Sequence, residues 1–250
     1  MPFLSNQIIS RTHLPDEVDF ISGVVMLVDK PIGWTSFDVV NKIRFKIKHN
    51  LKVKKIKVGH AGTLDPMATG LLLICTGKLT KEIDQLQAKI KGYTGTMFIG
   101  ATTPTYDAES DPDTFFETGH IKTDHIRDAV QALTGPLQQI PPVYSAIKIQ
   151  GKTSYDLARR GKEVEMKPRP VEVFEFDILN DDLNSLSFYV SCSKGTYIRS
   201  LVYDFGKLLH SGGYLNGLRR VSIGDFKAEN ALSIDEASAY IETVCQNKTI

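Results

Sequence analysis

The alternation of apolar and polar residues predicts a chain of short strands and helices. Nearly continuous apolar runs predict strands at 24–28 and 71–75, the second of them buried. The lysine-rich segment 52–58 alternates and predicts a strand or an extended loop. A helix is predicted over 37–49, with Ser36 as its N-cap, because apolar residues recur there at helical spacing: Phe37, Val40, Ile43 and Ile47.

The second half of the chain continues this mixture. Residues 170–179 and 185–193 alternate as half-buried strands do, and 195–213 form an amphipathic pattern that ends in glycines. A helix is predicted near 123–133, before the Gly-Pro pair that follows. We therefore predict an α+β fold with a mixed, mostly antiparallel sheet and helices on its faces.

One segment differs from these core elements. Residues 140–171 begin with Pro-Pro and predict a short strand followed by a helix from Ser154. Four lysines and three arginines fall between Lys148 and Arg169. We therefore predict a projecting, basic insertion at about 143–168. The rest of the chain divides into a lead-in, a main domain and a short helical tail: 1–22, 23–226 and 227–250.

Charge is unevenly distributed, although the formal net charge is only +1. The acidic residues gather outside the segment from Val39 to Leu64, for example in a polar, turn-rich loop at 107–112. A polyanion responds to a local patch rather than to the total. The segment therefore indicates either a nucleic-acid surface or a solvated basic helix and loop. It contains Lys42, Arg44, Lys46, Lys48, His49, Lys52, Lys54, Lys55, Lys57 and His60.

The composition is that of an ordinary soluble globular domain. The chain has 250 residues, 42% of them hydrophobic. Its apolar runs are about five residues long, whereas a membrane helix needs roughly twenty. The N-terminus lacks a secretory pattern, and three widely spaced cysteines indicate neither a disulfide framework nor a zinc site. We expect a cytoplasmic protein that makes no membrane contact.

Asp65 is the first candidate for chemistry. Signatures of phosphate loops, dinucleotide sites and zinc sites are absent from the sequence, which argues against those enzyme classes. Asp65 lies in VGHAGTLDPMATG, residues 58–70, where Pro66 favours an extended conformation at Asp65. The carboxylate is either a nucleophile or acid–base group, or the cap of an Asp-Pro turn.

The sequence alone leaves two interpretations open for each of the other candidates. In SKGTYIRS, Tyr197 and Arg199 follow a predicted strand, and an arginine beside a buried carboxylate would keep it ionised. Arg199 is alternatively a surface residue at a helix start. Tyr93 is either a core-edge aromatic or a base-stacking platform. His60 is either a hydrogen-bonding loop residue or a catalyst.

Five segments together resemble one family, the bacterial tRNA pseudouridine synthases of the TruB type. The resemblance covers about residues 23–226, in order, and G-H-x-G-T-L-D-P-x-A-T-G is its most specific motif. Many relatives carry a C-terminal PUA domain, and we expect this chain to lack one. The segments are GVVMLVDKPIGWTSFDVVNKIR, VGHAGTLDPMATGLLLICTGKLTK, IPPVYSAIKIQGKTSYDLARRG, CSKGTYIRSLVYDFGKLL and GYLNGLRRVSIGDF.

The resemblance implies a pseudouridine synthase fold and the isomerisation of uridine 55 in the tRNA T loop. The target base is flipped out, its C–N bond is broken, and C5 joins C1′ without a cofactor or a metal. Asp65 matches the catalytic aspartate, which attacks C1′, attacks C6 or removes a 2′ proton. Arg199 matches the arginine that pairs with it, and Tyr93 the tyrosine that stacks on the base. Matches to pocket or substrate-binding positions are Lys30, Pro31, His60, Thr63, Tyr197 and Leu218.

The implied partner is the tRNA T stem-loop, on which the 143–168 insertion would close as a thumb. Basic groups there and in the segment 42–57 would contact phosphates, and a monomer suffices. Two alternatives remain: a synthase that acts on another RNA with a T-loop-like fold, and an RNA-binding or tRNA-folding factor.

Overall fold

The computed structural model describes residues 5–149, 151–162 and 164–246 and divides the chain into two compact units. Unit 1 comprises 1–91 and 219–250, and unit 2 comprises 92–218. Parts of the predicted lead-in, insertion and tail, at 1–4, 150, 163 and 247–250, lie outside the described residues. Among the described residues, no helix has both the length and the apolar character that crossing a membrane requires.

Unit 1 contains a sheet in the order β1-β2-β4, with β3 paired to β4 and the second half of β13 beside β4. Strands β2 and β4 are antiparallel, and Lys30 lies opposite Gly70 in their register. The elements are η1 (Ser5–Gln7), β1 (Ile8–Ile9), β2 (Val25–Lys30), α1 (Ser36–Leu51), β3 (Val58–His60), β4 (Ala68–Thr76), η2 (Gly77–Glu82), α2 (Ile83–Ala88), β14 (Phe226–Lys227), η3 (Ala228–Asn230) and α6 (Ile234–Gln246).

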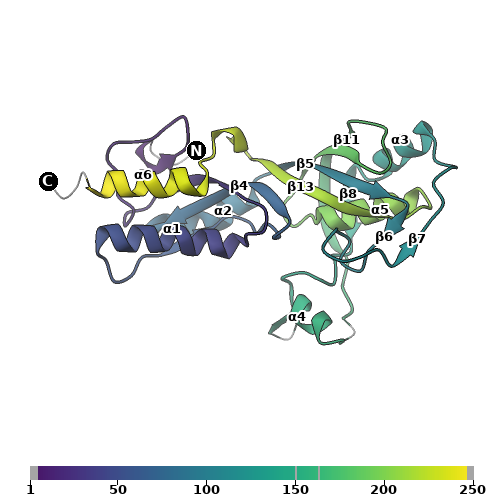
Figure 1. Ribbon diagram of the computed structural model, residues 1–250, viewed down its shortest axis with the longest axis horizontal. Helices are drawn as coiled ribbons and strands as arrows, with labels where there is room; N and C mark the ends of the chain where they lie inside the picture. Colours follow the sequence, from purple (N-terminus) through teal and green to yellow (C-terminus); the bar gives the residue numbers. More distant parts are fainter. Residues whose placement is uncertain (1–4, 150, 163, 247–250) are drawn as a thin grey trace. The chain divides into compact units, whose positions relative to one another are not determined.

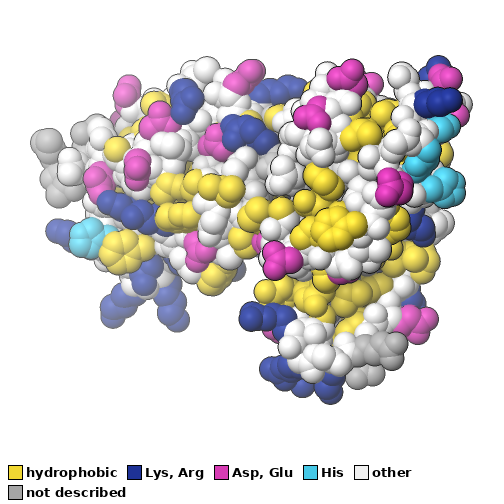
Figure 2. All heavy atoms as spheres, turned by 45° about the vertical axis from the view of Figure 1, so that its right-hand side comes forward, with side chains coloured by type: hydrophobic (Ala, Val, Ile, Leu, Met, Phe, Trp, Pro, Cys, Tyr) yellow, Lys and Arg dark blue, Asp and Glu magenta, His cyan; other side chains and the backbone are white. Residues whose placement is uncertain are grey.

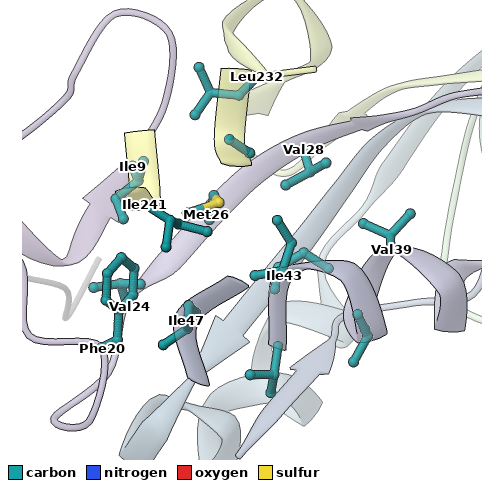
Figure 3. Close-up of a cluster of buried hydrophobic side chains, with 14 of the residues drawn as sticks. Ile9, Phe20, Val24, Met26, Val28, Val39, Ile43, Ile47, Leu232 and Ile241 are labelled. Carbon is teal, nitrogen blue, oxygen red and sulfur yellow. The ribbon is translucent and has the colours of Figure 1, made fainter. Parts of the chain in front are cut away.

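Both faces of this sheet are covered, which explains the continuous apolar runs in its strands. On one face, Met26 and Val28 of β2 pack in a core with Ile43 and Ile47 of α1 and Ile241 of α6 (Figure 3). Figure 1 shows α1 and α6 side by side over the strands. The alternate residues of β2 point to the other face, where they pack against α2 and the β13–η3 segment.

Helix α1 has well-defined ends. Thr35 accepts a hydrogen bond from the Asp38 amide and Asp38 accepts one from the Thr35 amide, a capping box. The predicted cap at Ser36 was therefore wrong by one residue. Lys52 ends the helix in the left-handed conformation, with φ of 53°. Residues 53–57 form an extended loop rather than a strand.

Unit 2 contains a sheet in the order β5-β12-β11-β8, with the first half of β13 beside β5. The pairs β11–β12 and β11–β8 are antiparallel, as predicted. Phe176 of β11 packs edge-on against Phe188 of β12 and Phe205 of α5. The elements are β5 (Lys91–Ile99), β6 (Ala101–Thr102), β7 (Thr114–Phe115), α3 (Thr123–Ala132), β8 (Gly135–Gln139), β9 (Lys148–Ile149), β10 (Lys152–Thr153), α4 (Ser154–Arg159), β11 (Arg169–Ile178), β12 (Leu186–Cys192), α5 (Ile198–Leu208) and β13 (Gly213–Ile223).

The 143–168 segment contains the small hairpin β9–β10 and the helix α4 (Figure 1). Its root is hydrogen-bonded, since the Tyr155 amide donates to the Ser145 carbonyl and the hydroxyls of Ser145 and Ser154 are 3.0 Å apart. Seven basic side chains are exposed between 148 and 169: Lys148, Lys152, Arg159, Arg160, Lys162, Lys167 and Arg169.

Candidate active site

The candidate residues divide between the two units. Unit 1 contains Lys30, Pro31, His60, Thr63 and Asp65. Unit 2 contains Tyr93, Tyr197, Arg199 and Leu218.

Asp65 lies in the loop at 61–67, between β3 and β4. The Asp65 carbonyl accepts a hydrogen bond of 3.0 Å from the Ala68 amide, which closes a turn with Pro66 at its second position. The predicted Asp-Pro turn is therefore present, but the backbone closes it. The side chain of Asp65 is half-buried. We refer to residues 62–66 as the Asp65 loop.

Two side chains of unit 1 hold the middle and the end of the Asp65 loop. The Ser36 hydroxyl accepts from the Leu64 amide at 2.8 Å and donates to the Leu64 carbonyl at 3.2 Å. The Lys30 ammonium donates to the carbonyls of Pro31, Trp34 and Pro66 at 3.0, 2.6 and 3.4 Å. These contacts fix the backbone on both sides of Asp65.

Arg220 holds the start of the loop. This side chain is 1% exposed. Its guanidinium donates to the carbonyls of Leu71 at 2.7 Å, Gly62 at 3.0 Å and Thr63 at 3.4 Å. Gly70, with φ of +101°, lets the β13 backbone approach, because a Cβ there would lie 2.3 Å from the Arg220 carbonyl oxygen. Arg220 was not among the candidates predicted from the sequence, since LRRVSI resembles an ordinary strand.

The electrostatics around the loop are dominated by these buried cations. Burial lowers the pKa of Lys30, the Asp65 carboxylate opposes that shift and Arg220 adds to it, with a net pKa of about 8. Burial also lowers the pKa of His60, and Arg220 adds to this effect. His60 is therefore neutral at pH 7, and its Nδ1 is buried without a hydrogen-bond partner among the described residues. A carboxylate in this setting experiences a positive field.

The lowered pKa of Lys30 makes a testable contribution to stability. Between about pH 8 and 10.5 the unfolded chain retains a proton that native Lys30 has released, so the contribution of Lys30 to the free energy of unfolding rises with pH through this window. The rise is on the order of 3 kcal/mol. Cys75, Tyr106 and Tyr240, whose pKa values burial raises to about 12, contribute the opposite slope in part of this window, so the test is a comparison. From pH 8 to 10.5, wild type is expected to gain stability relative to Lys30→Met in urea titrations. Identical slopes in the two proteins would contradict the lowered pKa.

In unit 2, Arg199 is 6% exposed, so its reading as a surface arginine was wrong. It lies in the first turn of α5, and its guanidinium donates to the carbonyls of Thr105 at 3.0 Å and Tyr144 at 2.9 Å. It also lies 3.4 Å from the Asp107 carboxylate, which is itself 4% exposed. The contact with Tyr144 links Arg199 to the root of the 143–168 segment.

Asp107 is a second residue that the sequence analysis missed. It was assigned to a solvated polar loop, yet it is buried and accepts hydrogen bonds from the Thr105 hydroxyl and the Glu109 amide at 2.5 and 3.1 Å. A buried charge needs such partners. The sequence carries no signal that separates Asp107 from the exposed acids after it, because only burial in the structure distinguishes them.

The remaining candidates occupy regular elements. Tyr93 lies on β5 and is 8% exposed. Tyr197 is the N-cap residue of α5, and its amide and carbonyl are both bonded to the Gln139 side chain. Leu218 is half-buried on β13, and Thr63 is exposed in the Asp65 loop. Within the described ranges, histidines, cysteines and carboxylates form no cluster of three or more able to hold a metal.

Comparison with known proteins places this chain in a family. Residues 48–198 match the family described as TruB family pseudouridylate synthase (N terminal domain). A tRNA pseudouridine synthase B from Parabacteroides distasonis is 47% identical over 225 residues, which are 90% of this chain and 96% of the relative. One from Flavobacterium johnsoniae is 50% identical over 217 residues, 86% of this chain and 95% of the relative.

Solved structures agree on the fold. A chain in the crystal structure of a Cbf5-Nop10-Gar1 complex superposes with a TM-score of 0.65 at 26% identity. The match covers 94% of this chain but only 63% of that longer one. A chain in the structure of an H/ACA RNP bound to a substrate RNA gives a TM-score of 0.64 at 24% identity and shows the same fold. The predicted pseudouridine synthase fold is confirmed, and the chain belongs to the TruB family of pseudouridylate synthases.

Proposed function

We propose that this protein converts uridine 55 in the T loop of tRNA to pseudouridine. The observation that carries the proposal is the match along 90% of the chain to a relative named tRNA pseudouridine synthase B. The reaction is an isomerisation: the C1′–N1 bond breaks, the base turns in the site, and a C1′–C5 bond forms. The proton on C5 leaves, and N1 gains one.

Asp65 is the residue on which this chemistry depends. Its backbone is fixed on both sides by Arg220, Ser36 and Lys30, so the carboxylate is presented on a rigid loop. The three candidate steps, which are attack at C1′, attack at C6 and removal of the 2′ proton, all use a carboxylate as nucleophile or base. We assign Tyr93, Tyr197, Arg199 and Leu218 to the same reaction because they match positions of the family, with Tyr93 as the stacking platform.

The remaining candidates of unit 1 have supporting roles. Neutral His60 brings no second positive charge to the flipped nucleotide. Thr63 is exposed and Pro31 half-buried, so both are accessible to substrate.

The 143–168 segment is proposed to bind the T arm as a thumb. Its six exposed cations attract phosphates, and the Arg159 guanidinium lies over the Tyr155 ring at 5.7 Å. The Tyr144 carbonyl at its root accepts a hydrogen bond from Arg199. A movement of this segment on RNA binding would therefore shift a direct partner of that arginine.

We further propose that the protein acts as a monomer in the cytoplasm. Its three cysteines are buried and unpaired with one another, as suits a reducing compartment. Sedimentation of the purified protein tests the monomer.

The decisive experiment is an assay on an unmodified T-arm stem-loop at low salt. We expect pseudouridine at position 55 and strong inhibition by salt, because phosphate contacts supply much of the affinity. The control RNA carries cytidine at the target position. A stem-loop that binds without giving product would instead support an RNA-binding factor. Product from another RNA alone would support a different substrate.

A further inference from the structure

The outward side of α1 carries aromatic residues that the core does not use. Phe37 and Phe45 are 60% and 64% exposed, although the opposite side of the helix packs in the core. The rings of Phe45 and His49 stack with centroids 5.9 Å apart and planes at 12°. Positions 41, 45 and 49 follow one another at helical spacing, so they share one face.

A hollow lies at the N-terminal half of the same face. Its volume is about 450 Å³, and it is lined by Gly33, Trp34, Asp38, Asn41 and Lys42. This volume is within the range of small-ligand sites and is sufficient for a nucleotide. The carboxylate of Asp38 is held by the Thr35 amide and hydroxyl in the capping box.

Exposed lysines continue from this face into the loop that follows α1. Figure 2 shows Lys and Arg side chains gathered with a histidine and a hydrophobic side chain at the lower left, over the part that holds α1. Lys46 pairs with Glu242, and Arg44 donates to Asn41 and to the Val58 carbonyl, so these two cations are engaged. The exposed lysines are Lys48, Lys52, Lys54, Lys55 and Lys57.

We propose that this α1 surface, formed by the hollow, the Phe45–His49 stack and the lysines at 48–57, binds unpaired nucleotides of the tRNA. The charge selects a polyanion over an apolar protein partner. The stacked rings and the hollow select unpaired bases over a duplex, whose bases already stack on one another. The inference rests on the proposed function, because tRNA is the RNA it names.

The nucleotides at the lysine-rich end of this surface differ from the target uridine. Helix α1 begins beside the Asp65 loop, where Ser36 bonds to Leu64. Its 16 residues extend about 24 Å from there. The lysine-rich end of the α1 surface therefore lies roughly one helix length away from Asp65, and it contacts a second part of the same RNA.

The test measures Kd for an unmodified full-length tRNA transcript as a function of salt. Phe45→Ala is expected to raise Kd about tenfold without changing the salt slope, because stacking is lost and no phosphate contact is. Lys54→Glu/Lys55→Glu is expected to raise Kd and to reduce the slope of log Kd against log salt by about 1.4, at 0.7 per single-strand contact. Lys78→Glu/Lys81→Glu, exposed lysines elsewhere in unit 1, is the charge-matched control.

Any of three outcomes would contradict RNA binding by the α1 surface. These are an unchanged Kd for Phe45→Ala, an unchanged salt slope for Lys54→Glu/Lys55→Glu, and an equal loss of affinity in the control pair. Wild-type turnover on the T-arm stem-loop is assayed in parallel. Its absence would count against the proposed function, whereas unchanged binding by the variants alongside normal wild-type turnover would remove only the α1 surface.

Discussion

Asp65→Asn is expected to abolish pseudouridine formation while leaving tRNA binding within a few-fold of wild type. Removing the principal catalytic side chain of an enzyme costs on the order of 10⁴-fold or more in kcat. Asparagine keeps the shape of the side chain, but it is neither a carboxylate nucleophile nor a base. The measurement is single-turnover pseudouridine formation on the T-arm stem-loop, with Kd determined on the same RNA.

Asp225→Asn is the matched control, since Asp225 is an exposed carboxylate in the turn between β13 and β14. It is expected to keep wild-type turnover. Comparable rates for Asp65→Asn and wild type would exclude Asp65 from the chemistry. A large loss of RNA affinity in Asp65→Asn would also contradict the expectation, because an anionic side chain facing an RNA site does not attract phosphates.

Most of the fold was predictable because the spacing of apolar residues and the local composition favour the same secondary structure along the chain. Strands β4, β11 and β12 and helices α1, α3 and α5 all begin and end within a few residues of the predicted positions. The errors are local. The helix cap moved from Ser36 to Thr35, because the Ser36 hydroxyl is used by the Leu64 backbone instead.

The candidate site was less accessible to sequence reasoning. Asp65 could be found because a carboxylate among glycines and a proline is unusual. Asp107 and Arg220 could not, because their importance comes from burial and from partners distant in the sequence. Spacing along the chain carries no information about a guanidinium in β13 that reaches carbonyls on the loop before β4. Such residues emerge only when the strands are paired.

The buried cations also explain how unit 1 tolerates so polar a loop. The Gly62, Thr63, Leu64, Asp65 and Pro66 carbonyls each accept a hydrogen bond from a side chain or an amide. An unpaired buried carbonyl costs about 1–3 kcal/mol. The loop is therefore rigid at the position where function requires a fixed carboxylate, and the cost is the burial of two positive charges.

Arg220→Met is accordingly expected to impair both stability and catalysis. Methionine keeps an unbranched apolar stem but is shorter and donates no hydrogen bond, so the Leu71 and Gly62 carbonyls lose this donor. We expect the free energy of unfolding to fall by about 2–5 kcal/mol. We expect kcat to fall about 10²-fold in protein that is still folded, since a displaced loop misplaces Asp65. Urea titration and single-turnover kinetics measure the two effects.

Arg219→Met separates this role from general loss of charge. Arg219 is the preceding residue on β13 and pairs with Asp29 at 2.6 Å at a partly exposed site, so its loss should cost at most about 1 kcal/mol. The pKa of His60, measured by NMR titration, reports whether the positive charge of Arg220 is present beside it. Because Arg220 lowers the pKa of His60, that pKa should rise in Arg220→Met and stay at its wild-type value in Arg219→Met. Equal effects of the two variants on kcat and on His60 would show that Arg220 does not position the Asp65 loop.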